Sequence, residues 1–358
     1  MTADHATTQF TKVQDVVQNY RPSKLFKAPP TTTYTSIDFD DTGEFLLLSR
    51  SDDTIQLYNA KAGAHAKELK SQKYGTALAR FTHHPMSVLY ASTKIDDGIR
   101  YLSMHDNNFI RYFKGHQGRV TSLCLSPSGD HFLSGSLDNT VKLWDFRSPH
   151  PQGELSFDAA PYLVAYDPSA SVIAIASTPA QQILLYDLKN YDKPPFAEFD
   201  LLETEKKYIH LGQRPAEGWT GIEFSNNGKY MLISTNGPGH YLIDAFSGDL
   251  IHYLHRPSGN THRLAPGDVL LDGNASYVQA DACFTPDGRY VVGAAGSSKP
   301  GLLVWDAQEP EGKGRVLEPT VDLPCTKPAA VVAHNPRHNQ LASADKELVM
   351  WLPDMDLT

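Results

Sequence analysis

Cysteine is scarce in this sequence, which has only Cys124, Cys283 and Cys325 among its 358 residues. An odd number of cysteines at wide spacing does not favour a disulfide framework. We therefore expect a reducing compartment, the cytosol or the nucleus. Long apolar runs are lacking as well, because no stretch approaches the ~18 consecutive apolar residues of a membrane-spanning helix. No membrane association is expected.

An excess of basic residues is also absent. The chain has 41 acidic and 32 basic residues, which gives a formal net charge of −9. Broad binding to nucleic acid requires a basic face, so no direct nucleic-acid contact is expected. The sequence contains no G-x-S-x-G, GK[ST], H-E-x-x-H or C-x-x-C motif. We therefore expect neither a cofactor nor a metal, and we do not expect an enzyme.

What the sequence does contain is a repeat, which is clearest between Gly115 and Asp145. This segment reads GHQGRVTSLCLSPSGDHFLSGSLDNTVKLWD. Apolar alternation predicts three strands, and the turn residues between them separate the strands. The segment resembles the WD40 repeat, which begins with Gly-His and ends with Trp-Asp.

Six more degenerate copies of this pattern predict seven blades in all. The expected third-strand anchors are spaced by 39 to 62 residues, where one repeat spans about 40–45. They are Tyr58, His105, Trp144, Tyr186, Ile243, Trp305 and Trp351. The two widest spacings indicate insertions at 202–218 and 255–278. The predicted fold class is all-β, a seven-bladed WD40 β-propeller.

The last blade lacks an outer strand, because the sequence ends soon after the third strand. A strand-like segment, Ser23–Ala28, precedes blade one. We expect it to pair into blade seven and to close the ring, which would remove an open sheet edge. The predicted organisation is an N-terminal tail over residues 1–22 and a single propeller over 23–358.

Blade three carries His116, Ser134, Asp138 and Trp144 at the spacing of the WD40 family. In WD repeats these four residues form a structural hydrogen-bond relay. A Ser-His-Asp catalytic triad is the alternative interpretation. We favour the structural one, because the serine lies inside a strand without a strained elbow or an implied oxyanion hole.

Several segments resemble one particular WD-repeat family. They include TKIDDGIRYLSMHDNNFIRYFKGH (93–116), ILLYDLKNYDKPPFAEF (183–199), WTGIEFSNNGKYMLISTNG (219–237) and MWLPD (350–354). They look like the WD-repeat subunit shared by the COMPASS complex, a SET-domain methyltransferase of histone H3 lysine 4, and by assemblies for cleavage and polyadenylation that contain protein phosphatase 1. The resemblance covers about Ser23 to Asp354. The two insertions depart from it.

The resemblance implies a non-catalytic scaffold in the nucleus. Its partners would be the SET-domain methyltransferase, subunits of the 3′-end processing and phosphatase complex, and phosphorylated C-terminal repeats of RNA polymerase II. The role would lie in histone methylation, mRNA 3′-end processing and transcription termination. The alternatives are a generic WD40 adaptor, such as a ubiquitin-ligase substrate receptor, and a propeller hydrolase with a site in the central channel.

Six residues are candidates for partner binding, because they lie at or near loops of the expected peptide-binding face. They are Lys73, Tyr74, Lys94, Arg100, Arg119 and Trp219. Adjacent Arg and Lys residues also suit a phosphate group. We expect charge reversal at Arg100 and Arg119 to weaken partner capture without changing the thermal melt.

Overall fold

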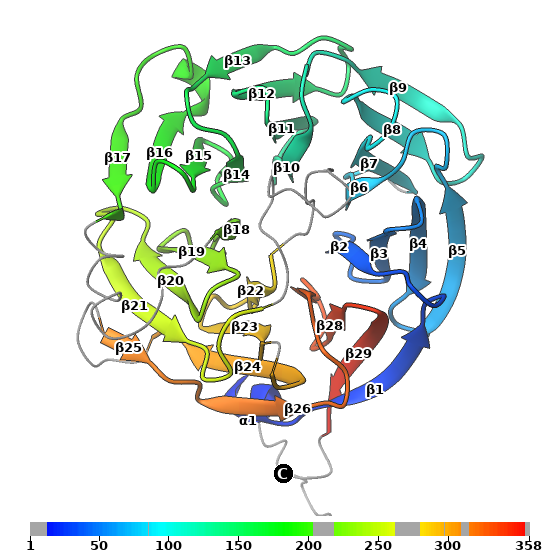
Figure 1. Ribbon diagram of the computed structural model, residues 1–358, viewed down its shortest axis with the longest axis vertical. Coiled ribbons are helices and arrows are strands. Elements are labelled where there is room, and N and C mark those ends of the chain that lie inside the picture. Colours follow the sequence, from blue (N-terminus) through cyan, green and yellow to red (C-terminus); the bar gives the residue numbers. More distant parts are fainter. Residues whose placement is uncertain are drawn as a thin grey trace, which may run out of the picture.

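Seven small sheets, antiparallel except for one added strand, surround a central axis and form a closed ring in the computed structural model (Figure 1). The structure describes residues 13–84, 86–202, 218–261, 280–296, 298–308 and 315–354. The seven-bladed propeller that the repeat predicts is therefore confirmed. None of the described helices is long and apolar enough to span a membrane.

Each of the first four blades consists of four consecutive strands, ordered from the channel outward. Blade one contains β2 (Tyr34–Phe39), β3 (Phe45–Arg50), β4 (Thr54–Asn59) and β5 (Ala64–Lys70). Blade two contains β6 (Ala77–Phe81), β7 (Ser87–Ala91), β8 (Ile99–Ser103) and β9 (Phe109–Phe113). Blade three contains β10 (Val120–Leu125), β11 (His131–Ser136), β12 (Thr140–Asp145) and β13 (Gly153–Ser156). Blade four contains β14 (Tyr162–Tyr166), β15 (Val172–Ser177), β16 (Gln182–Asp187) and β17 (Ala197–Asp200), with the 3₁₀ helix η1 (Leu188–Asn190) before its outer strand.

The last three blades are less regular. Blade five contains β18 (Trp219–Phe224), β19 (Tyr230–Thr235), β20 (Gly239–Asp244) and β21 (Leu250–His255), and β25 (Arg315–Leu317) pairs with β21 as a fifth strand. Blade six contains β22 (Ala282–Phe284), β23 (Tyr290–Ala294), β24 (Gly301–Asp306) and β26 (Val321–Pro324). Blade seven contains β27 (Val331–His334), β28 (Leu341–Ala344), β29 (Glu347–Pro353) and β1 (Tyr20–Lys27).

The core lies between neighbouring blades, because both faces of the inner strands are covered. All five residues of β14 are buried, for example, and β15 is buried from Ile173 onward. Such strands read as apolar runs because neither face meets water. Between blades two and three the packed side chains include Leu89, Val120 and Trp144.

The tight turns follow the chemistry of their residues. In blade three, the turn before the third strand places Asn139 at φ 64°, and Asp53 holds φ 62° in the turn of blade one. Asparagine and aspartate tolerate this left-handed conformation better than most other side chains. In blade two, however, the predicted anchor His105 is wrong, because β8 ends at Ser103 and Leu102 pairs with Val88 at the position that Trp144 occupies.

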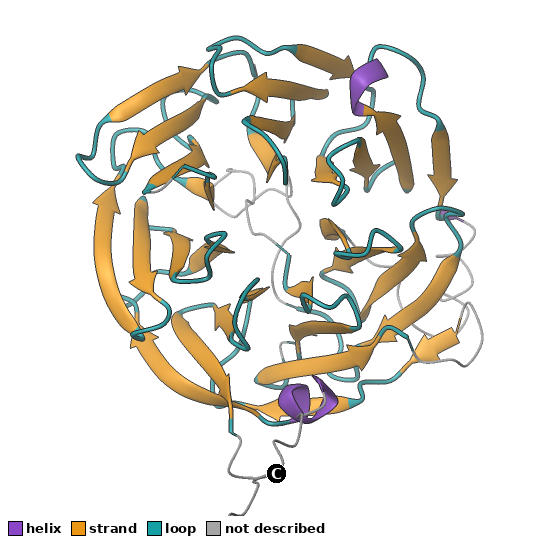
Figure 2. Ribbon diagram, turned by 180° about the vertical axis from the view of Figure 1, so that it is seen from behind, coloured by secondary structure: helices purple, strands orange, loops and turns teal. Residues whose placement is uncertain are grey.

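The ring closes through β1, which pairs antiparallel with β29 from Tyr20↔Pro353 to Lys27↔Glu347. The closing strand is longer than the predicted 23–28. A short helix, α1 (Val13–Gln18), precedes it and lies beside the seam, as seen from behind in Figure 2. Val16 and Val17 of this helix are buried against blades six and seven. Residues 13–22 are thus part of the packed structure and not of a tail.

The β25 strand was not predicted. It runs parallel to β21, with His252 opposite Arg315 and Leu254 opposite Leu317. Blade six therefore takes its outer strand, β26, from after this excursion. Most of the two predicted insertions, 203–217 and 262–278, lies outside the described residues.

Candidate functional site

The polar side chains of blade three form a continuous hydrogen-bonded chain. His116 Nδ1 lies 2.9 Å from Asp138 Oδ2, and His116 Nε2 lies 2.7 Å from Ser134 Oγ. Trp144 Nε1 donates to Ser134 Oγ at 2.8 Å. Because a carboxylate only accepts, Nδ1 of a neutral imidazole carries the hydrogen, and Nε2 then accepts from the serine hydroxyl.

This chain links the blade's loop to its core. Ser134 and Trp144 are completely buried, and the side chain of His116 is 1% exposed. Burial opposes ionisation of Asp138, but hydrogen bonds from His116, Thr140 and the backbone N–H of Gln117 hold the pKa of that carboxyl well below its usual range. A buried serine that accepts an indole hydrogen bond is not presented to a substrate, so the geometry supports the structural interpretation.

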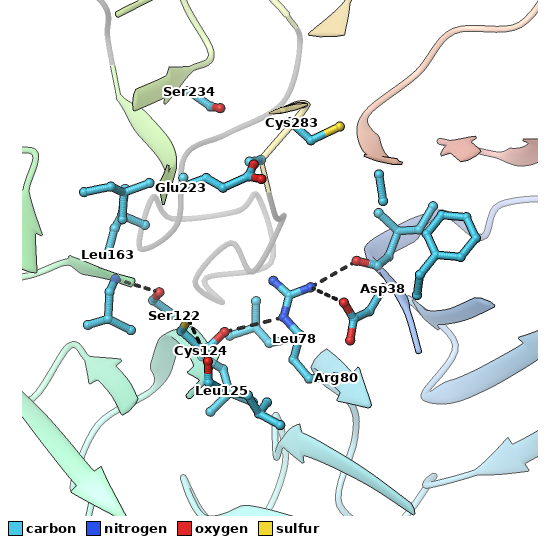
Figure 3. Close-up of a pocket in the computed structure, with 18 of the residues that line it drawn as sticks. Asp38, Leu78, Arg80, Ser122, Cys124, Leu125, Leu163, Glu223, Ser234 and Cys283 are labelled. Atoms are coloured by element: carbon cyan, nitrogen blue, oxygen red, sulfur yellow. Dashed lines mark hydrogen bonds and ion pairs between the residues drawn. The ribbon is translucent and has the colours of Figure 1, made fainter. Parts of the chain in front are cut away.

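The central channel contains a cavity of about 460 Å³, lined by residues of the innermost strands. Figure 3 shows Asp38, Arg80, Cys124, Glu223 and Cys283 around it. Arg80 Nη1 lies 3.9 Å from Asp38 Oδ1, and its Nε donates to the Leu123 carbonyl oxygen at 3.5 Å. The described lining is therefore partly polar, with the Arg80 guanidinium and the carboxyl groups of Asp38, Asp41 and Glu223.

Burial along the channel raises the pKa of its acids and thiols. Burial raises the pKa of Glu223 to about 7. It also raises the pKa of Asp38 to about 6, against the opposing charge of Arg80. The pKa of Cys124 is raised by burial, and the pKa of Cys283 is raised further by burial and the nearby Glu223. A protonated thiol is a poor nucleophile and a poor metal ligand.

Two histidines are among the described residues that line the cavity, and one of them, His334, is engaged on both sides. His334 Nδ1 donates to the carbonyl oxygen of Asn335 at 2.8 Å, and its Nε2 accepts from the Tyr20 hydroxyl at 3.1 Å. Burial lowers the pKa of His334 to about 4. Nowhere in the described part of the chain do three His, Cys, Asp or Glu side chains gather as metal ligands would. The other cavity histidine, His83, lies 2.6 Å from Asp41 Oδ2 through Nδ1 and 2.8 Å from the Ser126 carbonyl oxygen through Nε2, so both of its ring nitrogens are also engaged.

Four of the six candidate partner-binding residues lie together on the face that carries the connection between β9 and β10. We refer to Lys73, Tyr74, Lys94 and Arg119 as the blade-two surface. Backbone N–H groups of Thr93 and Lys94 donate to the Tyr74 carbonyl oxygen at 2.9 and 2.8 Å. Arg119 donates to the Thr93 carbonyl oxygen and lies 3.6 Å from Asp97. Lys73 and Lys94 are exposed, and Lys94 also pairs with Asp53.

The other two candidates are core residues, which corrects their expected role. Trp219 is 1% exposed and packs between blades four and five. Arg100 is 2% exposed; it donates to Asp96 at 2.8 and 2.9 Å and to Ser92 at 2.8 Å. Its guanidinium lies 3.4 Å from the centre of the Tyr74 ring. Charge reversal at Arg100 cannot leave the thermal melt unchanged, because it would place a second carboxylate beside Asp96.

Comparison with known proteins agrees with this architecture. The family model described as "WD domain, G-beta repeat" matches residues 107–145. WD repeat-containing protein 82 of Drosophila melanogaster is 38% identical over 341 residues, which cover 95% of this chain and 96% of the relative. The COMPASS component SWD2 of Saccharomyces cerevisiae is 33% identical over 94% of this chain and 95% of its own length. The Set1 complex component swd2 of Schizosaccharomyces pombe is 40% identical over 77% of this chain and 72% of its own length.

This chain belongs to the SWD2/WD repeat-containing protein 82 family. The family resemblance inferred from the sequence is therefore confirmed. Because the similarity to two of these relatives covers 94–95% of this chain, it extends over the propeller and not only over the repeat at residues 107–145.

The SWD2-type propeller also contains polar networks that the sequence analysis missed. Between blades five and six, Arg256 Nη2 lies 2.7 Å from Asp281 Oδ2 and 2.8 Å from His240 Nε2, with Arg256 and His240 fully buried. In blades one and two, the acids bonded by arginine are Asp52 and Asp96. In the sequence, Asp52 could have been identified only from the D-x-T pattern that residues 52–54 share with residues 138–140.

Proposed function

We propose that this protein is a non-catalytic scaffold subunit of a Set1-type histone methyltransferase complex. The observation that carries the proposal is similarity over nearly the full length to relatives named as a COMPASS component and as a Set1 complex component. A closed ring with mostly structural polar networks suits a scaffold, because rigid blades hold loops and edges in fixed positions for partners. The enzymatic step would belong to the SET-domain partner.

The proposal has a finer part, which the resemblance in the sequence suggests. The protein would act in the nucleus. It would also join cleavage and polyadenylation factors with protein phosphatase 1 and would connect both assemblies to RNA polymerase II with phosphorylated C-terminal repeats. The exposed lysines of the blade-two surface support contact with acidic or phosphorylated segments, since lysine is a good partner for such groups.

Affinity purification of the tagged full chain from nuclear extract, with quantitative mass spectrometry, tests the proposal. We expect co-elution of a SET-domain methyltransferase, and of 3′-end processing and phosphatase subunits for the finer part. An eluate dominated by ubiquitin-ligase subunits, without a methyltransferase, would refute the scaffold assignment. Fluorescence imaging of the tagged chain checks the expected nuclear location.

A pair of matched variants tests the blade-two surface. Lys73→Glu combined with Arg119→Glu should reduce partner recovery several-fold, because it reverses two charges on exposed or half-exposed side chains. Lys189→Glu combined with Lys193→Glu reverses two exposed charges on blade four and should leave recovery unchanged. Equal recovery from both variants would exclude the blade-two surface as a contact.

A further inference from the structure

The outer edges of the seven blades are protected from strand pairing to different degrees. An unpaired edge strand can accept another chain, and proteins block this with charges, prolines, short strands or a covering segment. The outer strands of blades one, three, four, six and seven carry lysine, glutamate, aspartate or proline. These residues are Lys67, Glu68 and Lys70 in β5, Glu154 in β13, Glu198 and Asp200 in β17, Asp322 and Pro324 in β26, and Pro22, Lys24 and Lys27 in β1.

The edge of blade five is covered by the chain itself. The β25 strand pairs with β21 in parallel over three residues, so the protein already contains one instance of strand addition to an outer edge. Tyr253 and Leu254 of β21 are buried, and Leu317 of β25 is 8% exposed. An apolar outer edge in this propeller is thus compatible with a fifth strand.

Blade two has an apolar edge to which no described strand is added. Its outer strand β9 reads FIRYF, and β8 is its neighbour in the sheet. Ile110, which the pairing with β8 skips as a β-bulge, is 48% exposed, and Tyr112 is 39% exposed. Arg111 is the strand's one charged residue, and its guanidinium donates to the Phe146 carbonyl oxygen of blade three at 2.8 Å, so it turns away from the open edge. Figure 1 shows β9 on the outer rim of the ring.

Two exposed lysines lie beside β9, and one exposed acid, Asp106, precedes the strand. Lys114 directly follows the strand and is exposed, and Lys73 is exposed with its ammonium 5.0 Å from the centre of the Tyr74 ring. The ion pairs found among the described residues include neither of these lysines. The Arg100 guanidinium lies 5.0 Å from the centre of the Tyr112 ring, which links the exposed tyrosine to the same cationic cluster.

We propose that β9 is a docking edge to which an extended, acidic segment of a partner protein adds as a fifth strand of blade two. Backbone hydrogen bonds would give the affinity, and alternate side chains would contact Ile110 and Tyr112. Acidic residues in the segment would pair with Lys73 and Lys114. This inference rests on the proposed scaffold role, since it names the surface by which such a scaffold holds a partner.

A second copy of this chain fits the edge less well. In an antiparallel pair of two β9 strands centred on Arg111, the Arg111 side chains of the two copies would lie opposite each other, and like charges directly opposite are destabilising. An acidic segment of another protein meets no such repulsion. Self-association is therefore an outcome of the test that would overturn the proposal.

Site-specific photo-crosslinking in the intact complex gives the first test. The tagged full chain carries benzoylphenylalanine at position 110 or 112, and at position 246 in the control, because Phe246 is 95% exposed on blade five. We expect crosslinks from 110 and 112, and not from 246, to one partner segment that is rich in Asp or Glu and in β-branched or aromatic residues. Crosslinks to a second copy, to a basic segment, or to no partner from a complex that co-elutes intact would overturn the proposal.

The mapped segment, made as a synthetic peptide, gives the second test by fluorescence anisotropy. Ile110→Asp with Tyr112→Asp should weaken peptide binding about tenfold or more, and Lys114→Glu should weaken it several-fold. The control, Phe196→Asp with Phe246→Asp, places the same charges on two other exposed aromatic positions and should bind as the wild type does. Circular dichroism checks that all variants keep the wild-type melt.

Hydrogen exchange separates strand addition from a contact through side chains alone. Bound peptide should slow exchange of the backbone amides of β9 and leave those of β13 unchanged. Unchanged exchange in β9 would refute the strand geometry. If no methyltransferase co-elutes but the crosslinks and the slowed exchange are present, the Set1 assignment fails and the docking edge stands. If the methyltransferase co-elutes but the crosslinks and the slowed exchange are absent, the docking edge fails and the Set1 assignment stands.

Discussion

Replacement of Arg100 by alanine removes a cation from the interior of blade two. The Asp96 carboxylate loses both of its bonds to the guanidinium, and the buried Ser92 hydroxyl loses its donor. A hydrogen bond to a charged group contributes about 1.5–3 kcal/mol to stability. The stacking of the guanidinium on Tyr74, at 3.4 Å, adds about 1–2 kcal/mol. Because Asp96 is one-third exposed and partly screened, we expect a total loss of about 3–5 kcal/mol.

This loss translates into a moderate shift in melting temperature. The unfolding entropy is about 2.1 cal/mol/K per residue, which for a chain of this length gives a shift of roughly 4–7 °C. Differential scanning calorimetry at neutral pH measures it. Arg119→Ala is the control, because that side chain is 30% exposed and 3.6 Å from its acid, so the loss should stay below about 1 kcal/mol. A melt of Arg100→Ala within about 1 °C of the wild type would refute the assignment of Arg100 to the core.

Three further predictions concern the buried polar groups. Ser134→Ala removes the acceptor of the Trp144 indole N–H, and should lower the free energy of unfolding by about 2–4 kcal/mol in a denaturant titration, whereas an unchanged midpoint would contradict the relay. Glu223→Gln should stabilise the protein by about 1–2 kcal/mol at pH 8 and by little at pH 5. Because burial raises the folded-state pKa of Glu223 to about 7, the wild type loses stability as the pH rises from about 4.5 to 7. An identical dependence of stability on pH in both proteins would exclude this cause. Asp281→Ala leaves the Arg256 guanidinium buried without its acid and should cost about 3–5 kcal/mol by calorimetry, while a loss below about 1 kcal/mol would show that the pair adds little.

The features of the fold that could be predicted from the sequence are those encoded by local residue patterns. The stretch from Gly115 to Asp145 contains strand alternation, turn residues and the relay within one blade, so each level agrees with the others. Pairing of β25 with β21 could not be predicted in the same way, because it joins segments about 60 residues apart and involves three residues with no periodic signal. The closing strand was found from the missing outer strand of blade seven, but its first residues and the helix before it were not.

The candidate site was predicted less well than the fold, because burial depends on neighbouring blades. Arg100 looks like a loop-proximal cation in the sequence, yet Tyr74 from the preceding connection covers its guanidinium. Trp219 is the first residue of β18 and follows an insertion. At such a position the sequence does not distinguish a loop residue from the first residue of an inner strand. The basic cluster and the exposed residues of β9, in contrast, follow directly from the strand pattern once its outer position is known.

Closure through β1 has a consequence for synthesis on the ribosome. The partner of β1 is translated roughly 320 residues later, which at about 5–20 residues per second takes tens of seconds. Throughout that time β1 has no strand to pair with, and its sequence, YRPSKLFK, suits the delay because proline and positive charges discourage premature pairing. The ring closes through β1 only after β29 has emerged, so a nascent chain that stalls in blade seven retains two unpaired strand edges.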